Sequence, residues 1–133
     1  MSNRKIAKCK GSQGNWLVDV TIDGRTVSLP TAHALFVRVG LDGRLFYDRP
    51  VFWTQSERRA TQWKKFRAAL LKHKRVVITE DDWSTDENGV GKAVRKGYIA
   101  IYEVTNIIAT NVHGLVFELT NRVAEAYAVS EVP

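Results

Sequence analysis

The chain has 133 residues, 44% of them hydrophobic, one cysteine and a formal net charge of +6 at pH 7. This length suits one domain with a hydrophobic core, so residues 1–133 are expected to form a single globular domain. The single cysteine, Cys9, excludes an internal disulfide and a metal cage built from several thiolates of this chain. The positive charge favours an anionic partner, and nucleic-acid backbones are the commonest one.

Two features of the chain bear on its location. No apolar run is long enough to span a bilayer, and residues 1–10 lack the apolar segment of a signal peptide. A soluble, cytoplasmic protein without membrane contact is therefore expected.

Alternating apolar and polar residues predict strands in the first third of the chain. Residues 16–22 alternate in this way, and Asp23 and Gly24 then form a two-residue hairpin turn. Residues 4–10 are expected to add a strand beside this hairpin. The turn length places apolar residues of the two strands opposite one another: Val20 with Val27, and Val18 with Leu29.

The segment after the first hairpin predicts a short helical turn and a second hairpin. Pro30 is expected to end the preceding strand, and residues 31–34 to make one helical turn. Strand alternation then resumes at residues 35–39. Asp42 and Gly43 make the next turn, and residues 45–47 form the returning strand.

One long basic helix is predicted for residues 57–74, because Ser56 is a good N-cap and no Gly or Pro interrupts the segment. Its outward side carries Arg58, Lys65 and Lys72. From residue 58 to residue 79 there are eight Lys or Arg and no Asp or Glu, although an inert surface would be better served by mixed charge. Its apolar side, which is expected to pack on a sheet, consists of Ala60, Trp63, Phe66, Leu70 and Leu71.

A central strand and an acidic loop are predicted after the helix. Val76, Val77 and Ile78 are consecutive β-branched residues, typical of a strand covered on both faces. Residues 80–91 are then expected to form a long exposed loop that holds five acids and Trp83. That tryptophan either folds back over the core or offers a stacking surface. The basic residues Lys92, Arg95 and Lys96 follow.

The last third of the chain predicts two more strands. Residues 98–102 are apolar on both faces, and Leu115, Phe117 and Leu119 alternate with residues that suit a half-exposed face. The tail, residues 122–129, is compatible with either helix or strand. The pattern as a whole predicts an α+β domain, in which a mostly antiparallel sheet or partial barrel packs against the one long amphipathic basic helix.

The sequence assigns no catalytic residue, metal or cofactor. Glu80, Asp81 and Asp82 suggest a metal-dependent hydrolase, but neighbours on a strand point to opposite faces, so at most two could share an ion. His33, His73 and His113 are forty residues apart. Nucleophile and phosphate-loop motifs are missing as well, so enzymatic activity is left open, with a non-catalytic domain preferred.

The preferred hypothesis is a module that binds DNA or RNA, without distinction between the two. Cations on a helix and aromatic residues near loops are the ingredients of backbone contact and base stacking. The alternative is a protein-interaction domain that meets an acidic partner or another copy of the chain. The residues expected to bind nucleic acid are Arg58, Lys65, Lys72, Lys92, Arg95, Lys96 and Trp83.

A family resemblance adds to this hypothesis. The order of hairpins, basic helix, short strand, acidic stretch and the strand GYIAIYEV, Gly97–Val104, resembles small uncharacterised bacterial proteins of unknown function. Residues Lys96 to Val104 are also similar, more loosely, to the mixed barrels of the PUA-like group, whose members bind RNA or modified bases. This second resemblance favours nucleic-acid binding and transfers no site residue.

Overall fold

A computed structural model gives the fold of the chain. It describes residues 5–11, 16–50, 57–85, 87–89, 91–110 and 114–129, with the side chains of residues 83 and 91–94 excepted. The elements are β1 (Lys5–Lys10), β2 (Leu17–Ile22), β3 (Arg25–His33), the 3-10 turn η1 (Ala34–Phe36), β4 (Val37–Val39), β5 (Leu45–Arg49), α1 (Glu57–His73), β6 (Arg75–Thr85), β7 (Gly91–Thr110) and β8 (Gly114–Ala128).

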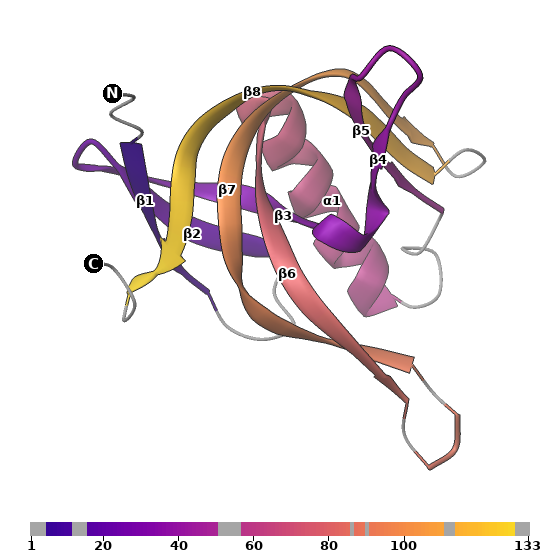
Figure 1. The fold of residues 1–133 in the computed structure, drawn as a ribbon. Coiled ribbons are helices and arrows are strands. Elements are labelled where there is room, and N and C mark those ends of the chain that lie inside the picture. The colour runs from indigo at the N-terminus through magenta and orange to yellow at the C-terminus, as the bar shows by residue number, and fades with distance from the viewer. Residues whose placement is uncertain are drawn as a thin grey trace.

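The expected α+β fold with a partial barrel is wrong. The molecule is mostly β, and six strands form a closed barrel in the order β1-β2-β3-β6-β7-β8, with β8 pairing back onto β1 (Figure 1). The pairs β1–β8 and β3–β6 are parallel, and the other pairs are antiparallel. Closure removes the two free edges that an open sheet would expose. The short strands β5 and β4 continue the sheet outward from β8.

The barrel encloses the first of two hydrophobic cores, here called the barrel core. Every barrel strand contributes at least one residue to it. Small side chains line the seam between β1 and β8, which lets the two strands approach closely. The buried residues are Ala7, Cys9, Val18, Val20, Leu29, Val77, Ile101, Ala124 and Ala126.

Helix α1 lies outside the barrel, behind the strands in Figure 1, and covers the second core, here called the helix core. The predicted helix is confirmed with an end at His73, and Ser56 lies outside the described residues. Trp63, Phe66 and Leu70 are buried as expected. Leu71, in contrast, is 42% exposed, because it lies at the border of the apolar stripe.

Strand β6 separates the two cores, as expected of a strand covered on both faces. Val77 is buried in the barrel core, whereas Val76 and Ile78 are buried in the helix core. Successive side chains of a strand point to opposite faces, so one run of β-branched residues serves both cores.

The first hairpin has the predicted turn and register, with Val20 opposite Val27 and Val18 opposite Leu29. The predicted end of its second strand is wrong, because β3 passes through Pro30 and continues to His33. Pro30 is the last residue of β3 that pairs with β2. The next three residues pair with β6 instead, so the helical turn begins only at Ala34.

Two further expectations concern the distal segments. The predicted acidic loop is instead a two-stranded arm, in which β6 runs to Thr85 and β7 begins at Gly91. The arm projects from one end of the barrel (Figure 1). The tail, left open between helix and strand, is strand as far as Ala128. In the described ranges no helix is long and apolar enough to cross a membrane.

Candidate nucleic-acid interface and a buried polar cluster

The basic residues of α1 lie on its outward side. Arg58, Lys65 and Lys72, here called the helix face, are exposed, and Phe66 and Leu70 hold the opposite side of the helix in the helix core. Within the part of the chain that the structure describes, no ion pair joins these three cations to a carboxylate. The helix face therefore presents uncompensated positive charge.

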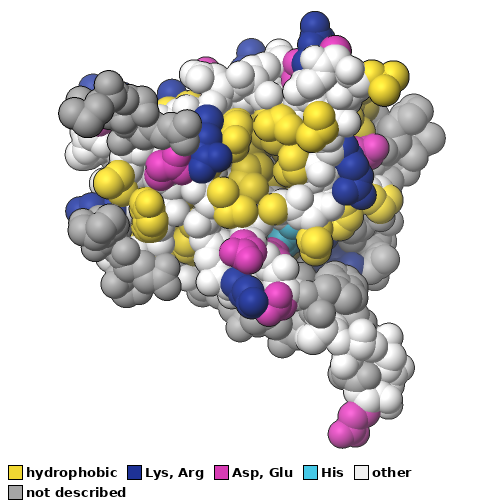
Figure 2. All heavy atoms as spheres, in the orientation of Figure 1, with side chains coloured by type: hydrophobic (Ala, Val, Ile, Leu, Met, Phe, Trp, Pro, Cys, Tyr) yellow, Lys and Arg dark blue, Asp and Glu magenta, His cyan; other side chains and the backbone are white. Residues whose placement is uncertain are grey.

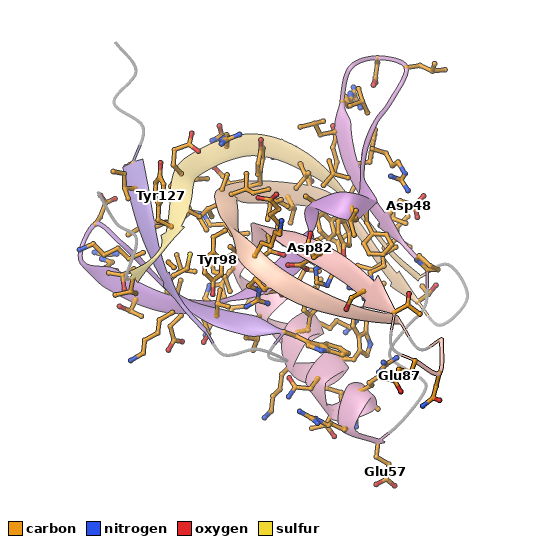
Figure 3. All side chains as sticks on the ribbon, turned by 60° about the horizontal axis from the view of Figure 1, so that its bottom comes forward. Asp48, Glu57, Asp82, Glu87, Tyr98 and Tyr127 are labelled. Carbon is orange, nitrogen blue, oxygen red and sulfur yellow. The ribbon has the colours of Figure 1, made fainter. Side chains whose placement is uncertain are left out.

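The described residues of the acidic stretch, which lies in the end of β6 and the turn of the arm, form no ion pair with the helix face. The side chain of Asp81 is 1% exposed and contacts His33. Asp82 pairs with Lys96, at 3.2 Å between its Oδ2 and the lysine Nζ. Glu87 lies at the turn of the arm, while Glu57 marks the start of α1 (Figure 3). Among the described residues none of these acids forms an ion pair with Arg58, Lys65 or Lys72.

The second predicted basic cluster divides between two environments. The guanidinium of Arg95 lies 5.5 Å from the centre of the Tyr98 ring and acts electrostatically on the buried Cys9, so it faces the end of the barrel. Tyr98 lies among the barrel strands in Figure 3. Lys96 is exposed beside Asp82. Lys92 and Trp83 lie in the arm, and their side chains are outside the described residues.

The face opposite α1 has a different character. Figure 2 shows hydrophobic side chains gathered at its centre, and most of the Lys and Arg visible there lie next to Asp or Glu. Most cations visible on this face therefore have an acid beside them, unlike the three cations of the helix face.

A groove lies between one side of α1 and the outer face of strands β1, β2 and β3. Its volume is about 470 Å³, and strands β1, β2 and β3 supply one wall while the helix supplies the other. This volume falls within the range of small-molecule binding sites, roughly 300 to 1,000 Å³. The lining residues are Lys10, Gly11, Leu17, Asp19, Ser28, Gln62 and Lys65. Lys65 thus belongs both to the helix face and to the groove.

A buried polar cluster lies where the parallel strands β3 and β6 run side by side. His33 is the register partner of Thr79, whose side chain is fully buried, and Asp81 follows two residues later. Two register shifts in β6, after Ile78 and after Glu80, break its alternation here. The Thr79 hydroxyl donates to Asp81 Oδ2 at 3.4 Å, and Nδ1 of His33 contacts the same oxygen.

The electrostatics of this cluster keep His33 neutral. Burial lowers its pKa to about 4, and the positive charges of Arg49 and Arg95 act in the same direction, against the contact with Asp81. Lone pairs on Nδ1 and on the carboxylate would repel each other, so this contact requires a proton between the two groups.

The same cluster holds two further unusual groups. Oδ1 of Asp81 is buried and has no hydrogen-bond partner among the described residues. Burial raises the pKa of the Tyr47 phenol, which lies against the Arg49 side chain and the His33 backbone. Arg49 also covers the Phe36 ring, 4.9 Å from its centre. Sequence patterns missed this cluster because only the parallel pairing of β3 with β6 brings His33 to Asp81.

No metal centre emerges from the described residues. Nowhere among them do three His, Cys, Asp or Glu side chains come together as a metal site. As expected for neighbours on a strand, Asp81 is buried while Asp82 is 61% exposed. His73 lies at the end of α1 and His33 at the end of β3, and His113 lies outside the described residues.

Comparisons with protein-family models, curated proteins and solved structures found no match to the chain. The resemblance of residues 96–104 to PUA-like barrels therefore stays a prediction.

Proposed function

We propose that the protein is a non-catalytic domain that contacts the backbone of a nucleic acid through the helix face. The observation that carries the proposal is the row formed by Arg58, Lys65 and Lys72, exposed and without carboxylate partners among the described residues. The three residues are seven positions apart, which places successive members about 10 Å apart along the helix.

The like charges of the helix face repel one another. Exposed cations without acids destabilise a helix slightly, and glutamates at neighbouring turns would remove that cost. A polyanion supplies the missing negative charge, and the counterions that it releases make binding favourable at low salt. Lys64 and Arg67, also exposed on α1, extend the positive surface around the helix face.

The remaining predicted residues have secondary roles in this proposal. Lys96 is exposed but shares its charge with Asp82. Arg95 serves the barrel end, where it acts on His33 and Cys9. Lys92 and Trp83 stay predictions, because their side chains are outside the described residues.

The test is a salt titration of binding to mixed-sequence single- and double-stranded DNA and RNA. The triple variant Arg58→Glu, Lys65→Glu, Lys72→Glu is compared with the parent by fluorescence anisotropy. The parent should show log K falling linearly with log salt. Loss of three phosphate contacts should make the slope shallower by about two to three units.

A control variant separates local contact from net charge. Lys5→Glu, Arg25→Glu, Arg38→Glu changes the charge by the same amount at exposed strand positions. It should retain most of the parent's slope. The proposal is overturned if the parent binds no nucleic acid at low salt, or if both variants lose affinity equally. Retention of an acidic protein or of a second copy in place of nucleic acid would favour the protein-interaction alternative.

A further inference from the structure

The groove beside α1 has two cationic walls. Lys10 lies at the end of β1, and Lys65 lies on the helix, so the two lysines line it from opposite elements. In the described part of the chain neither of them forms an ion pair, even with Asp19, which lines the same groove. Two free ammonium groups on facing walls are suited to holding one anionic group between them.

The positive wall continues along β1. Ala7 and Cys9 point into the barrel, so Lys8 and Lys10 point outward and are exposed. Side chains two residues apart on a strand are separated by about 7 Å. Lys8 therefore adds a second cation on β1, next to Lys10. An extended polyanion that lies along the strand could contact both lysines.

The strand wall of the groove carries a carboxylate, that of Asp19, which can accept a hydrogen bond. Ser28 donates to Oδ1 of Asp19 at 2.9 Å, an arrangement fixed by the cross-strand pairing of these two residues. Oδ2 of Asp19 has no hydrogen-bond partner among the described residues. An ionised carboxylate only accepts hydrogen bonds, so it repels phosphate and selects a group that donates.

The combination of charges specifies the ligand chemistry. Lys10 and Lys65 can hold a phosphate, and Asp19 can accept a hydrogen bond from a hydroxyl. A sugar phosphate with a free hydroxyl next to its phosphate offers both groups. A ribonucleotide unit of a strand carries such a hydroxyl at its 2′ position, and a deoxyribonucleotide lacks it. The volume of about 470 Å³ lies within the range of small-molecule sites, roughly 300 to 1,000 Å³, so it suits one nucleotide better than a duplex.

We infer that the groove between α1 and strands β1, β2 and β3 binds one ribonucleotide unit of single-stranded RNA. Lys10 and Lys65 hold the phosphate, and Asp19 accepts a hydrogen bond from the 2′-hydroxyl. The inference rests on the proposed function, which it narrows from nucleic acid in general to RNA.

The experiment compares a 12-nucleotide RNA with the DNA of the same sequence, both single-stranded, by fluorescence anisotropy at fixed low salt. A hydrogen bond to a charged group supports an RNA preference of about tenfold or more in the parent. Asp19→Ala should reduce this preference to near parity by weakening RNA binding. Lys10→Ala should weaken both strands alike and reduce the salt slope by about one unit.

Asp48→Ala is the matched control. Asp48, labelled in Figure 3, is an exposed acid on β5, a strand that does not line the groove, and its removal changes net charge by the same amount as Asp19→Ala. It should leave the ratio of RNA to DNA affinity unchanged. Because Asp19 and Asp48 are both exposed, neither change is expected to unfold the protein, and melting curves check this.

The outcomes separate the two proposals. Equal binding of RNA and DNA by the parent, or an unchanged ratio in Asp19→Ala, overturns the inference while leaving backbone binding by the helix face intact. If the parent protein binds neither RNA nor DNA, both proposals are overturned. A further arm uses adenosine 3′-monophosphate and 2′-deoxyadenosine 3′-monophosphate, whose phosphate is next to the 2′ position. If the ribonucleotide alone binds as tightly as the RNA and depends on Asp19, the ribonucleotide chemistry stands, but a free nucleotide replaces the strand as its source.

Discussion

His33 is a histidine that the fold holds in its neutral form. Burial and two nearby guanidinium groups, those of Arg49 and Arg95, disfavour a further positive charge on the imidazole. The charged groups around the ring are these two arginines and the Asp81 carboxylate, and the Tyr47 phenol forms a hydrogen bond with the His33 backbone. A buried polar cluster of this kind stabilises a fold only when its members keep the protonation states for which they are arranged.

The stability of the protein should therefore fall in mild acid. The unfolded chain binds a proton at His33 below its ordinary pKa of about 6.5, whereas the native chain binds one only near pH 4. Between these values the unfolded state binds more protons, so the free energy of unfolding decreases as pH falls. A shift of this size amounts to about 3 kcal/mol across the window. Urea denaturation at several pH values between 7 and 4 measures it.

The control for this prediction is His33→Gln, which removes the titrating ring and keeps a polar side chain. Its free energy of unfolding at pH 7 is expected to be lower than that of the parent, because Asp81 loses a partner. Between pH 6.5 and 4 its stability should change less with pH than the parent's. Parallel curves for the two proteins would show that other groups cause the acid sensitivity.

Helix α1 joins two properties in one element. Its inner side buries Trp63, Phe66 and Leu70 against the outer face of the barrel, each contributing about 1.5 to 3 kcal/mol. Its outer side carries the helix face and one wall of the groove. The apolar side determines where the helix lies, and the position of the helix determines which lysines meet β1 and β2.

This division of roles predicts opposite responses to two substitutions on α1. Phe66→Ala should lower the free energy of unfolding by about 3 to 5 kcal/mol, because a ring that is 3% exposed leaves a cavity. Lys65→Ala should change stability by less than about 0.5 kcal/mol while weakening nucleic-acid binding. Denaturant titration gives the first quantity and anisotropy the second. Similar losses of stability at both positions would mean that the two sides of the helix are assigned wrongly.

At the scale of the whole molecule, the two cores are expected to unfold together. Val77 belongs to the barrel core, and its neighbours Val76 and Ile78 belong to the helix core. Unfolding of β6 therefore removes buried side chains from both cores. Small domains that share elements in this way usually unfold in one cooperative transition.

Val77→Ala tests this coupling from the barrel side. Losing two methyl groups from a fully buried site should cost about 1 to 3 kcal/mol. Tryptophan fluorescence, to which Trp63 in the helix core contributes, should report the same shifted midpoint as far-UV circular dichroism. A fluorescence transition that stays in place while the dichroism transition moves would show that the helix core unfolds independently.

The local parts of the fold could be predicted because their causes lie within a few residues of sequence. The turn at Asp23 and Gly24 fixed the register of the first hairpin, and the 3.6-residue period identified α1 and its basic side. The apolar run Val76 to Ile78 indicated a strand covered on both faces. The same helical period placed Lys65 on the basic side of α1, so it could be proposed as a binding residue from the sequence.

The sequence by itself determined the helix, most of the strands and the sign of the surface charge, since periodicity and turn chemistry act over short distances. Tertiary structure alone decided that the sheet closes, because the pairing of β1 with β8 joins residues more than a hundred positions apart. It also decided where the polar groups meet. His33 reaches Asp81 through the parallel pairing of β3 with β6, and Lys10 reaches the groove that Lys65 lines because the helix core sets α1 beside the outer face of β2. No local pattern encodes such contacts, because they depend on how separate elements pack.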